Sequence, residues 1–243
     1  YHLGEKIATR EAYGNILANL AKSDSSIIAL DAEVSNSTKS ELVKIAAPTQ
    51  FIECFIAEQN MIGMALGLSK KWFNVFASTF SAFLTRAHDQ LRMSAISQAN
   101  FTITGSHSGV SVGEDGPSQM GLEDIALFRS LPNSIIFYPS DAVSAEKLIV
   151  QASKLRGIKY IRTTRPKTQV IYKKTETFPL GDFKIIKSSK KDKAVLVGSG
   201  ITLHESLKAY EKLKEKKINV AVVDLYCIKP FNYKKFEAFA KKL

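Results

Sequence analysis

The stretch from Phe51 to Ala77 reads FIECFIAEQNMIGMALGLSKKWFNVFA. Its first six residues, 51–56, form a short apolar run that is typical of a buried strand. Residues 58–68 follow with a helical pattern rich in Met, Ala, Leu and Gly, and residues 73–77 form another apolar strand run. A strand, a helix and a second strand in this order predict two parallel strands joined by a helix that covers one face of their sheet.

The same alternation extends through the first two thirds of the chain. Further strands are predicted at 27–30, 101–104, 134–138 and 160–162, and further helices at 8–20, 81–99, from about 122, and at 142–155. Strands that alternate with helices at this spacing are typical of an α/β fold. We therefore predict a mostly parallel sheet with helices on both faces.

The alternation stops in a polar stretch, 166–183, which contains Pro166, Pro179 and Gly181 and is interpreted as a linker. A second α/β unit is predicted to follow, with strands at 194–197 and 220–223, a helix at 202–213 and another helix that includes the last residues. These few elements cannot bury both faces of a sheet, so the second domain is predicted to be truncated. The predicted divisions are a first domain at 1–172, a linker at 173–183 and an incomplete domain at 184–243.

Composition restricts the possible partners. Among the 243 residues, 45% are hydrophobic, and 34 Lys and Arg outnumber 23 Asp and Glu, giving a net charge of +11. Most of the excess lies in late lysine-rich segments that alternate with apolar residues, which indicates solvated faces of ordinary elements. No apolar run approaches the ~18 residues of a membrane span. Neither nucleic acid nor a membrane is therefore expected as a partner.

The only cysteines, Cys54 and Cys227, lie far apart, which favours a reducing compartment.

Two short motifs indicate other functions only weakly. Residues 109–113, GVSVG, fit the nucleophile elbow of serine hydrolases, but EDGP follows where that motif needs a helix. Residues 198–200, GSG, lie between a strand and a helix as in dinucleotide folds, with Asp224 as a candidate ribose ligand, yet a tight turn explains them better. No spacing typical of a metal site occurs, and no metal ligand is predicted.

Polar side chains from distant parts of the chain follow predicted strands. Glu58 comes after the run at 51–56, His107 after 101–104, and Arg165 after 160–162, while Asp115 lies in a glycine-rich loop beyond His107. Ligands of parallel α/β sheets bind at the carboxyl ends of the strands. These residues are therefore predicted to line a functional cleft.

Several segments resemble the transketolase family, and the resemblance covers essentially the whole chain. The segments are KIATREAYG (6–14), FIECFIAEQNM (51–61), STF (78–80), TRA (85–87), DQ (89–90), GEDGPSQM (113–120), FYPSD (137–141) and IRTTRP (161–166). Most relatives outside animals have a histidine where Gln119 stands, so the Ser-Gln-Met version resembles the animal-type branch. The resemblance implies a pyrimidine-binding domain of the thiamine-diphosphate type, followed by the start of the family's C-terminal domain.

The resemblance also implies roles for individual residues. Glu58 matches the catalytic glutamate that contacts N1′ of the aminopyrimidine of thiamine diphosphate. The cofactor is further expected to touch Phe80, Phe83 and Gln119. His107 is expected to be catalytic and, with Asp115, to bind sugar hydroxyls and the reacting carbonyl region. The sugar phosphate is expected to be held by Arg10, Ser37 and Arg165, because a guanidinium can donate two hydrogen bonds to phosphate oxygens.

One departure from the family is large. The Gly-Asp-Gly segment with a downstream Asn, through which relatives bind diphosphate and Mg²⁺, is missing here. The resemblance thus implies half of a site, with the Mg²⁺ ligands in a diphosphate-binding half. That half is expected either in the same longer chain, which we favour, or in a separate subunit, giving a homodimer or a heterotetramer. This chain alone is expected to be inactive.

The implied activity is the transfer of a two-carbon ketol unit from a ketose phosphate to an aldose phosphate, through a carbanion on thiamine diphosphate. A cytoplasmic enzyme of the pentose phosphate pathway is expected. Two alternatives stay open: another thiamine enzyme, similar to deoxyxylulose-phosphate synthase or to the beta chain of 2-oxoacid dehydrogenases, and a non-catalytic binding module. The two arginines and Ser37 favour a phosphosugar, while Glu58, His107 and Asp115 argue against a decayed site.

Overall fold

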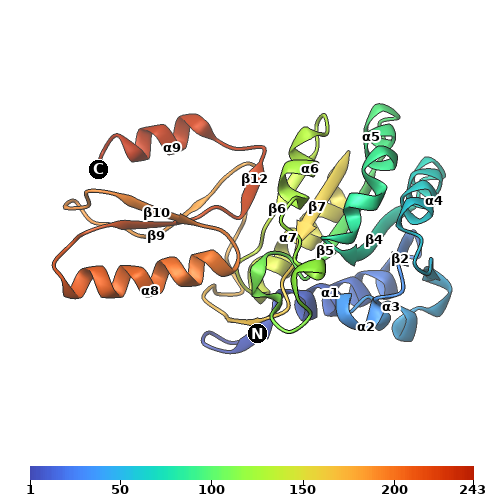
Figure 1. Cartoon of the computed structure of the whole chain (residues 1–243), viewed down its shortest axis with the longest axis horizontal. Helices are drawn as coiled ribbons and strands as arrows, with labels where there is room; N and C mark the ends of the chain where they lie inside the picture. The colour runs from blue at the N-terminus through green and yellow to red at the C-terminus, as the bar shows by residue number, and fades with distance from the viewer.

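The computed structural model describes residues 1–243 and is built around a seven-stranded sheet with the order β12-β6-β7-β5-β4-β2-β3 (Figure 1). All neighbouring strands are parallel except β12, which runs antiparallel to β6. The predicted mostly parallel sheet is confirmed. The strands are β2 (Ile27–Asp31), β3 (Phe51–Glu53), β4 (Asn74–Phe80), β5 (Phe101–Ser106), β6 (Ile135–Phe137), β7 (Ile158–Arg162) and β12 (Cys227–Lys229).

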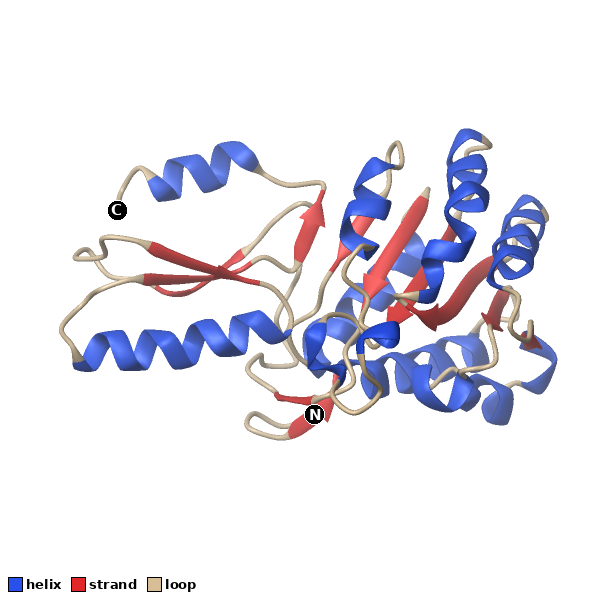
Figure 2. Cartoon of the chain, viewed as in Figure 1, coloured by secondary structure: helices blue, strands red, loops and turns tan.

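Helices cover both faces of this sheet (Figure 2). One face packs against α1 (Thr9–Ser23), α3 (Glu41–Ala46) and α7 (Ala142–Lys154), and the other against α4 (Glu58–Lys70), α5 (His88–Ile96) and α6 (Asp124–Ser130). The two apolar clusters contain 23 and 21 buried residues, so neither face is left to solvent. This double burial explains why the strands are continuous apolar runs rather than alternating ones. No helix has both the length and the apolar character needed to cross a membrane.

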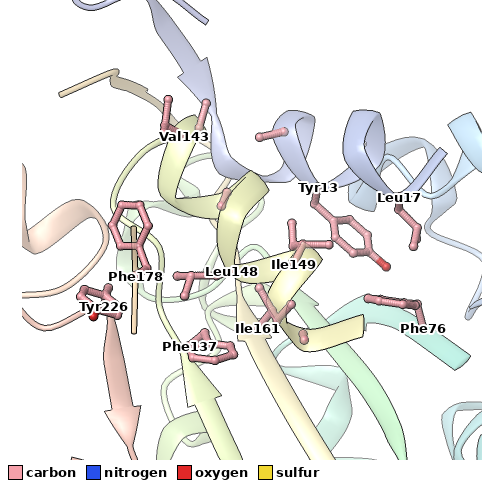
Figure 3. Packing of buried hydrophobic residues seen from close by; sticks show 14 of the residues in the cluster. Tyr13, Leu17, Phe76, Phe137, Val143, Leu148, Ile149, Ile161, Phe178 and Tyr226 are labelled. Atoms are coloured by element: carbon pink, nitrogen blue, oxygen red, sulfur yellow. The ribbon is translucent and has the colours of Figure 1, made fainter. Parts of the chain in front are cut away.

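The larger cluster joins α1 and α7 to the sheet. Figure 3 shows Tyr13 and Leu17 of α1 and Ile149 of α7 pointing toward Phe76 and Ile161 of the strands. These side chains are fully buried. At roughly 1.5–3 kcal/mol for each large apolar side chain, their burial is a major contribution to stability.

Several predicted boundaries were wrong. The strand predicted at 51–56 ends at Glu53, because Phe55 has a φ of 55° and turns the chain out of the sheet. The helix predicted at 81–99 is a short 3₁₀ helix, η2 (Phe83–Ala87), followed by α5. The helix predicted from about 122, by contrast, is confirmed and begins at Asp124.

Local pairings add short elements that periodicity does not indicate. β1 (Lys6–Ala8) pairs antiparallel with β8 (Lys167–Gln169), so the start of the chain is tied to the segment interpreted as a linker. That segment packs closely, because Val170, Tyr172 and Phe178 are buried in the larger cluster. The remaining short helices are α2 (Ser35–Thr38), η1 (Pro48–Gln50), η3 (Val110–Val112) and η4 (Pro117–Gln119).

Beyond residue 183 the chain forms a smaller α/β region, at the left in Figure 1. Its three-stranded sheet has the order β10-β11-β9, and β12 then leaves this region to extend the large sheet. The final helix ends at Ala240, so the prediction that the last residues are helical was wrong. The elements are β9 (Lys184–Lys187), β10 (Val195–Gly198), α8 (Ile201–Glu215), β11 (Ala221–Asp224) and α9 (Tyr233–Ala240).

Candidate active site

The predicted polar residues meet at the carboxyl edge of the large sheet. Glu58 opens α4 shortly after β3, Phe80 ends β4, His107 follows β5, and Arg165 follows β7. Because β3, β4, β5 and β7 are all parallel, their carboxyl ends share one edge. The structure thus brings together side chains that lie more than a hundred residues apart in the sequence.

An aromatic stack forms the centre of this edge. The Phe80 ring lies between those of Phe83 and His107, with centroid distances of 5.2 and 4.0 Å and interplanar angles of 17° and 15°. The Arg86 guanidinium lies 4.7 Å from the Phe83 centroid, within the range of a cation–π contact. The sequence predicted both phenylalanines and the histidine as site residues, but not that they stack.

Glu58 is a buried carboxylate, 3% exposed, at the first position of α4. The positive end of the helix dipole stabilises a carboxylate there. Its Oε1 accepts a hydrogen bond from Nη1 of Arg86 at 2.7 Å. Arg86 therefore joins the carboxylate to the aromatic stack. Sequence reasoning missed this residue as part of the site, although it lies in the family-like segment at 85–87.

His107 is held in an unusual conformation for a histidine. Its φ is 56°, in the left-handed region, and its side chain is almost fully buried. Nδ1 lies 3.0 Å from the Ser106 hydroxyl, and Nε2 lies 3.8 Å from Oδ2 of Asp115, too far for a hydrogen bond. Burial, followed by the positive charge of Arg10, lowers the His107 pKa to about 4, despite the opposing effect of Asp115. The imidazole is therefore neutral at pH 7 and can donate one hydrogen bond and accept another.

Two arginines lie beside this histidine. Nη1 of Arg10 donates to the backbone carbonyl of Ser37 at 2.9 Å, while its buried Nε has no hydrogen-bond partner. Nη1 of Arg165 donates to the carbonyl of Val112 at 2.9 Å and lies 3.2 Å from a carboxylate oxygen of Asp115. Burial lowers the Arg10 pKa, and Arg165 lowers it further. A pair of partly desolvated guanidinium groups of this kind is suited to an anion.

Gln119 is the predicted site residue least connected to the rest. It lies in η4, half-buried, and accepts a hydrogen bond from the neighbouring Ser118 hydroxyl. No hydrogen bond joins it to Glu58 or His107. Its loop is fixed at both ends, because the amide of Gly109 donates to the carbonyl of Gly121 at 2.9 Å.

The two competing motifs do not form sites. Ser111 lies in η3, which a glycine loop follows, and its buried hydroxyl has no hydrogen-bond partner, so no nucleophile is activated. Gly200 packs so closely that an added Cβ would lie 2.0 Å from the Tyr138 ring. Asp224 is fully buried and bonded to Ser140 and Tyr172, which leaves it unable to reach a ribose. Close packing therefore explains the Gly-Ser-Gly turn.

The residues fit only part of a thiamine-type cofactor. A buried carboxylate joined through Arg86 to a flat aromatic stack matches a heteroaromatic ring with a basic nitrogen. For a diphosphate with a metal ion, the chain offers no group of three or more His, Cys, Asp and Glu side chains arranged to hold the ion. The five main cavities of the chain also lie elsewhere, and none is lined by Glu58, His107 or Arg165.

Two family models together match most of the chain. The family model "Transketolase, pyrimidine binding domain" matches residues 5–170, and "Transketolase, C-terminal domain" matches 183–243. The chain is 55% identical to transketolase-like protein 2 of Mus musculus over 233 residues and 52% identical to transketolase of Homo sapiens over 235 residues. Each alignment covers 96% of this chain but only 37% and 38% of the relative.

Solved structures show the same fold. A split-gene transketolase, described as an inactive β4 tetramer, matches 98% of this chain and 77% of its own at a TM-score of 0.87 and 35% identity. Transketolase from Campylobacter jejuni matches 97% of this chain and 37% of its own at a TM-score of 0.86 and 25% identity. The resemblance seen in the sequence, including its animal-type character, is confirmed: the chain belongs to the transketolase family and spans about two fifths of the length of the curated relatives that it matches.

Proposed function

We propose that this chain supplies the pyrimidine-binding half of a transketolase active site, which transfers a two-carbon ketol unit between sugar phosphates. The observation that carries the proposal is the buried Glu58 carboxylate, joined through Arg86 to the Phe80–Phe83–His107 stack at the carboxyl edge of the sheet. Thiamine diphosphate, when bound, supplies the electron sink for this chemistry.

Glu58 holds a proton at the ring nitrogen N1′ of the cofactor. Its carboxyl group is buried beside the aromatic stack, where a proton can be shared between its oxygen and a ring nitrogen. The half-buried ring of Phe83 offers apolar surface to the pyrimidine, with Phe80 packed behind it, and Gln119 contributes a further polar contact. Asp115 and the neutral His107 then bind sugar hydroxyls and the carbonyl oxygen.

The phosphate of the sugar is held by Arg10 and Arg165, with Ser37 beside Arg10. The unpartnered Nε of Arg10 is a buried donor that an incoming phosphate oxygen can satisfy. Arg165 currently shares its charge with Glu114 and Asp115, both near 3.2 Å. Glu114 is almost fully exposed, so its contact is weak and a doubly charged phosphate can displace it.

The diphosphate and Mg²⁺ require a second polypeptide surface. Phe55 and Ile56, 65% and 74% exposed, form an apolar flank next to Glu58 that another surface can cover. A homodimer of longer chains or a heterotetramer with separate subunits would provide it, and the solved split-gene relative shows that a related half can exist as its own chain.

We place the domain divisions of this chain at 1–172 for the pyrimidine-binding domain, 173–183 for the linker and 184–243 for the start of the C-terminal domain. The cytoplasm and the pentose phosphate pathway belong to the same proposal and rest on family membership alone.

The proposal is tested by adding the missing half. Calorimetry is performed with thiamine diphosphate and Mg²⁺, first on the 243-residue chain and then on its mixture with a diphosphate-binding half from a relative. Pyrimidine contacts must offset an association cost of at least ~4 kcal/mol, so we expect no submicromolar binding by the chain alone and tight binding with ketol transfer by the mixture. Submicromolar binding by the isolated chain would contradict the division of the site.

A further inference from the structure

The loop between β5 and α6, residues 108–121, carries two of the predicted site residues, Asp115 and Gln119. Val112 is the only buried residue between its two ends, and Arg165 is bonded to the Val112 carbonyl. A segment with so little buried surface opens easily unless its ends are held. The contacts at the ends of the loop therefore decide where Asp115 and Gln119 lie.

The two ends are joined to each other. The amide of Gly109 donates to the carbonyl of Gly121 at 2.9 Å, and Ser108 and Gly121 form an isolated β-bridge. Gly121 has no room for a side chain, because an added Cβ would lie 2.1 Å from the Ser81 hydroxyl oxygen. The carbonyl of Gly121 is thus the point at which the loop is closed.

Arg162, the last residue of β7, binds the same carbonyl. Its Nη2 donates to the Gly121 oxygen at 3.0 Å, while its Nε donates to Oδ2 of Asp124 at 2.7 Å. The side chains of Arg162 and Asp124 are buried, 9% and 0% exposed, and the Tyr160 hydroxyl donates to the same Oδ2 at 2.6 Å. One guanidinium therefore joins the end of the loop to the first residue of α6, a task that suits its rigid fork of donors.

The smaller region completes the surroundings of Arg162. The guanidinium carbon lies 4.6 Å from the centroid of the Tyr138 ring, within the range of a cation–π contact. Gly200, directly before α8, packs against the same ring, and an added Cβ there would lie 2.0 Å from it. Contacts thus run from the smaller region through Tyr138 to Arg162, and from Arg162 to the loop.

We propose that Arg162 is a positioning residue, which holds the loop 108–121 so that Asp115 and Gln119 face the candidate active site, and that the smaller region keeps Arg162 in place through Tyr138. Arg162 has no hydrogen bond to a predicted site residue and acts only through the loop. The roles of Asp115 and Gln119 rest on the proposed function, whereas the closure of the loop does not. The smaller region, which contributes no predicted site residue, thereby gains a part in ketol transfer.

A role in folding alone makes a different prediction. Replacing only Arg162 would leave Asp124 as an unpaired buried charge and destabilise the chain in either case. The double variant Arg162→Met, Asp124→Asn removes both charges and keeps an acceptor for the Tyr160 hydroxyl, so we expect it to fold. If Arg162 serves only the fold, the loop of this variant should behave as in the wild type. If Arg162 positions the loop, the loop should open while the melting temperature stays close to that of the wild type.

Hydrogen–deuterium exchange of the 243-residue chain measures the closure directly, because the Gly109 amide is bonded across it. We expect exchange over 108–121 to be at least tenfold faster in the double variant, with exchange in β4 and β5 unchanged. Lys159→Met is the matched control, since Lys159 is another buried cation of β7 but donates to Asn100 and to Leu155 instead. It should leave exchange in the loop at the wild-type rate.

Two variants of Tyr138 test the part played by the smaller region, and both leave the ion pair of Arg162 and Asp124 intact. Tyr138→Phe keeps the ring between Gly200 and Arg162 and should not alter exchange in the loop. Tyr138→Leu removes the ring and should accelerate that exchange several-fold. Wild-type exchange in a folded Tyr138→Leu chain would overturn the link to the smaller region, and this variant also decides the proposal if the double variant does not fold.

The catalytic consequence is measured in an enzyme assembled with a diphosphate-binding half. The double variant should lower kcat/KM at least tenfold, because small displacements of positioning groups slow a reaction strongly, and Lys159→Met should not. Wild-type exchange in the loop of the folded double variant, or a wild-type kcat/KM in a variant whose loop is open, would overturn the proposal. Absence of ketol transfer in the wild-type assembly would instead contradict the proposed function, and the exchange result would still test the closure of the loop.

Discussion

Two buried acids differ in the hydrogen-bond partners that they have. Glu58 lies at the carboxyl edge of the large sheet. Asp224 lies where the large sheet meets the smaller α/β region, a place called the joint below and formed around Ser140, Asp141 and Tyr172. Asp224 is fully buried and accepts hydrogen bonds from the Ser140 hydroxyl at 2.7 Å and the Tyr172 hydroxyl at 2.5 Å. Glu58 is nearly as buried, but its partner is Arg86, whose side chain is 52% exposed. One acid is enclosed by its own chain, whereas the other is paired with a half-exposed side chain.

The surroundings extend this contrast. At the joint, Asp141 accepts from the amides of Ser144, Ile171 and Tyr172, and His204 of α8 contacts the Ser140 carbonyl at 2.7 Å. At the carboxyl edge, by comparison, the Nε of Arg10 has no partner, and Nε2 of His107 is 3.8 Å from the nearest carboxylate. Buried polar groups are normally satisfied, so the unpartnered Nε of Arg10 indicates a place for a ligand at this edge. The joint, in contrast, holds two parts of the fold together.

The largest expected effect that separates these regions is that of Glu58→Gln. In an enzyme assembled with a diphosphate-binding half, this variant should lower kcat by about 10²-fold or more, because glutamine keeps the shape but cannot carry the shared proton. Its melting temperature should remain close to that of the wild type. Steady-state kinetics and hydrogen–deuterium exchange at the thiazolium carbon measure the effect.

Glu41→Gln is a matched control for this change, since Glu41 also opens a helix but is partly exposed and lies away from the aromatic stack. It should leave kcat unchanged. If exchange at the thiazolium carbon runs at the wild-type rate in a folded, cofactor-saturated Glu58→Gln enzyme, Glu58 does not activate the cofactor and the contrast with Asp224 fails.

The next effect concerns the arginines of the same edge. Arg10→Ala and Arg165→Ala should each cost roughly 1.5–3 kcal/mol toward phosphorylated sugars, about 10- to 150-fold in kcat/KM, through loss of a charge-assisted hydrogen bond. Unphosphorylated acceptors should lose much less. The exposed Arg92 of α5 provides the control, and Arg92→Ala should affect neither substrate class. Equal losses on both classes would assign Arg10 and Arg165 to the fold.

A smaller effect is expected for His107→Ala. This variant should lower kcat about tenfold, and by more than it raises KM, because a neutral imidazole that donates to the reacting oxygen matters most when charge develops there. The His107 pKa of about 4 further implies that no activity limb near pH 6–7 arises from this residue. A pH–rate profile of the wild type and the variant is the measurement. An unchanged kcat would leave His107 with the packing role that its stack on Phe80 already provides.

Much of this edge could be predicted from the sequence, because strands buried on both faces have uninterrupted apolar sequences. Glu58, His107 and Arg165 each follow such a run, and the rule that ligands bind at strand carboxyl ends brings them together. The pairing of Arg86 with Glu58 could not be predicted, because it depends on how η2 packs beside α4. The Phe80–His107 stack likewise requires the left-handed φ of His107, which no periodicity encodes.

The joint could be predicted far less well. β12 contains only three residues, Cys227–Lys229, and pairs with β6, some ninety positions earlier, so no local pattern reveals it. The stretch at 166–183 has the proline and glycine content of a linker, yet two of its residues, Tyr172 and Phe178, bury their rings in the larger apolar cluster. Asp224 was interpreted as a possible ribose ligand, because a sequence does not show that Ser140 and Tyr172 enclose it.

The smallest expected effect, that of Asp224→Asn, concerns stability alone. Burial raises the Asp224 pKa to about 7, above the value of about 3.8 in the unfolded chain. The folded state therefore binds more protons between pH 4 and 7, so the stability contributed by the protonated acid is lost as the pH rises through this window. Asparagine cannot ionise, so the fall in unfolding free energy from pH 5 to pH 7.5 should be smaller in the variant. Asp31, whose pKa burial also raises to about 7, should maintain part of that fall.

Urea unfolding of the 243-residue chain at both pH values measures this difference. At pH 5 the variant should differ from the wild type by only about 1 kcal/mol, the usual net value of one altered hydrogen bond. Asp89→Asn, a change at an exposed position on α5, should reproduce the wild-type pH dependence. In the assembled enzyme, kcat should be unchanged by Asp224→Asn, the reverse of the pattern expected for Glu58→Gln. A large loss of kcat in a fully folded Asp224→Asn enzyme would contradict this expectation. Because Asp224 is enclosed by its own chain, it could affect turnover only indirectly, by shifting the residues at the carboxyl edge of the sheet.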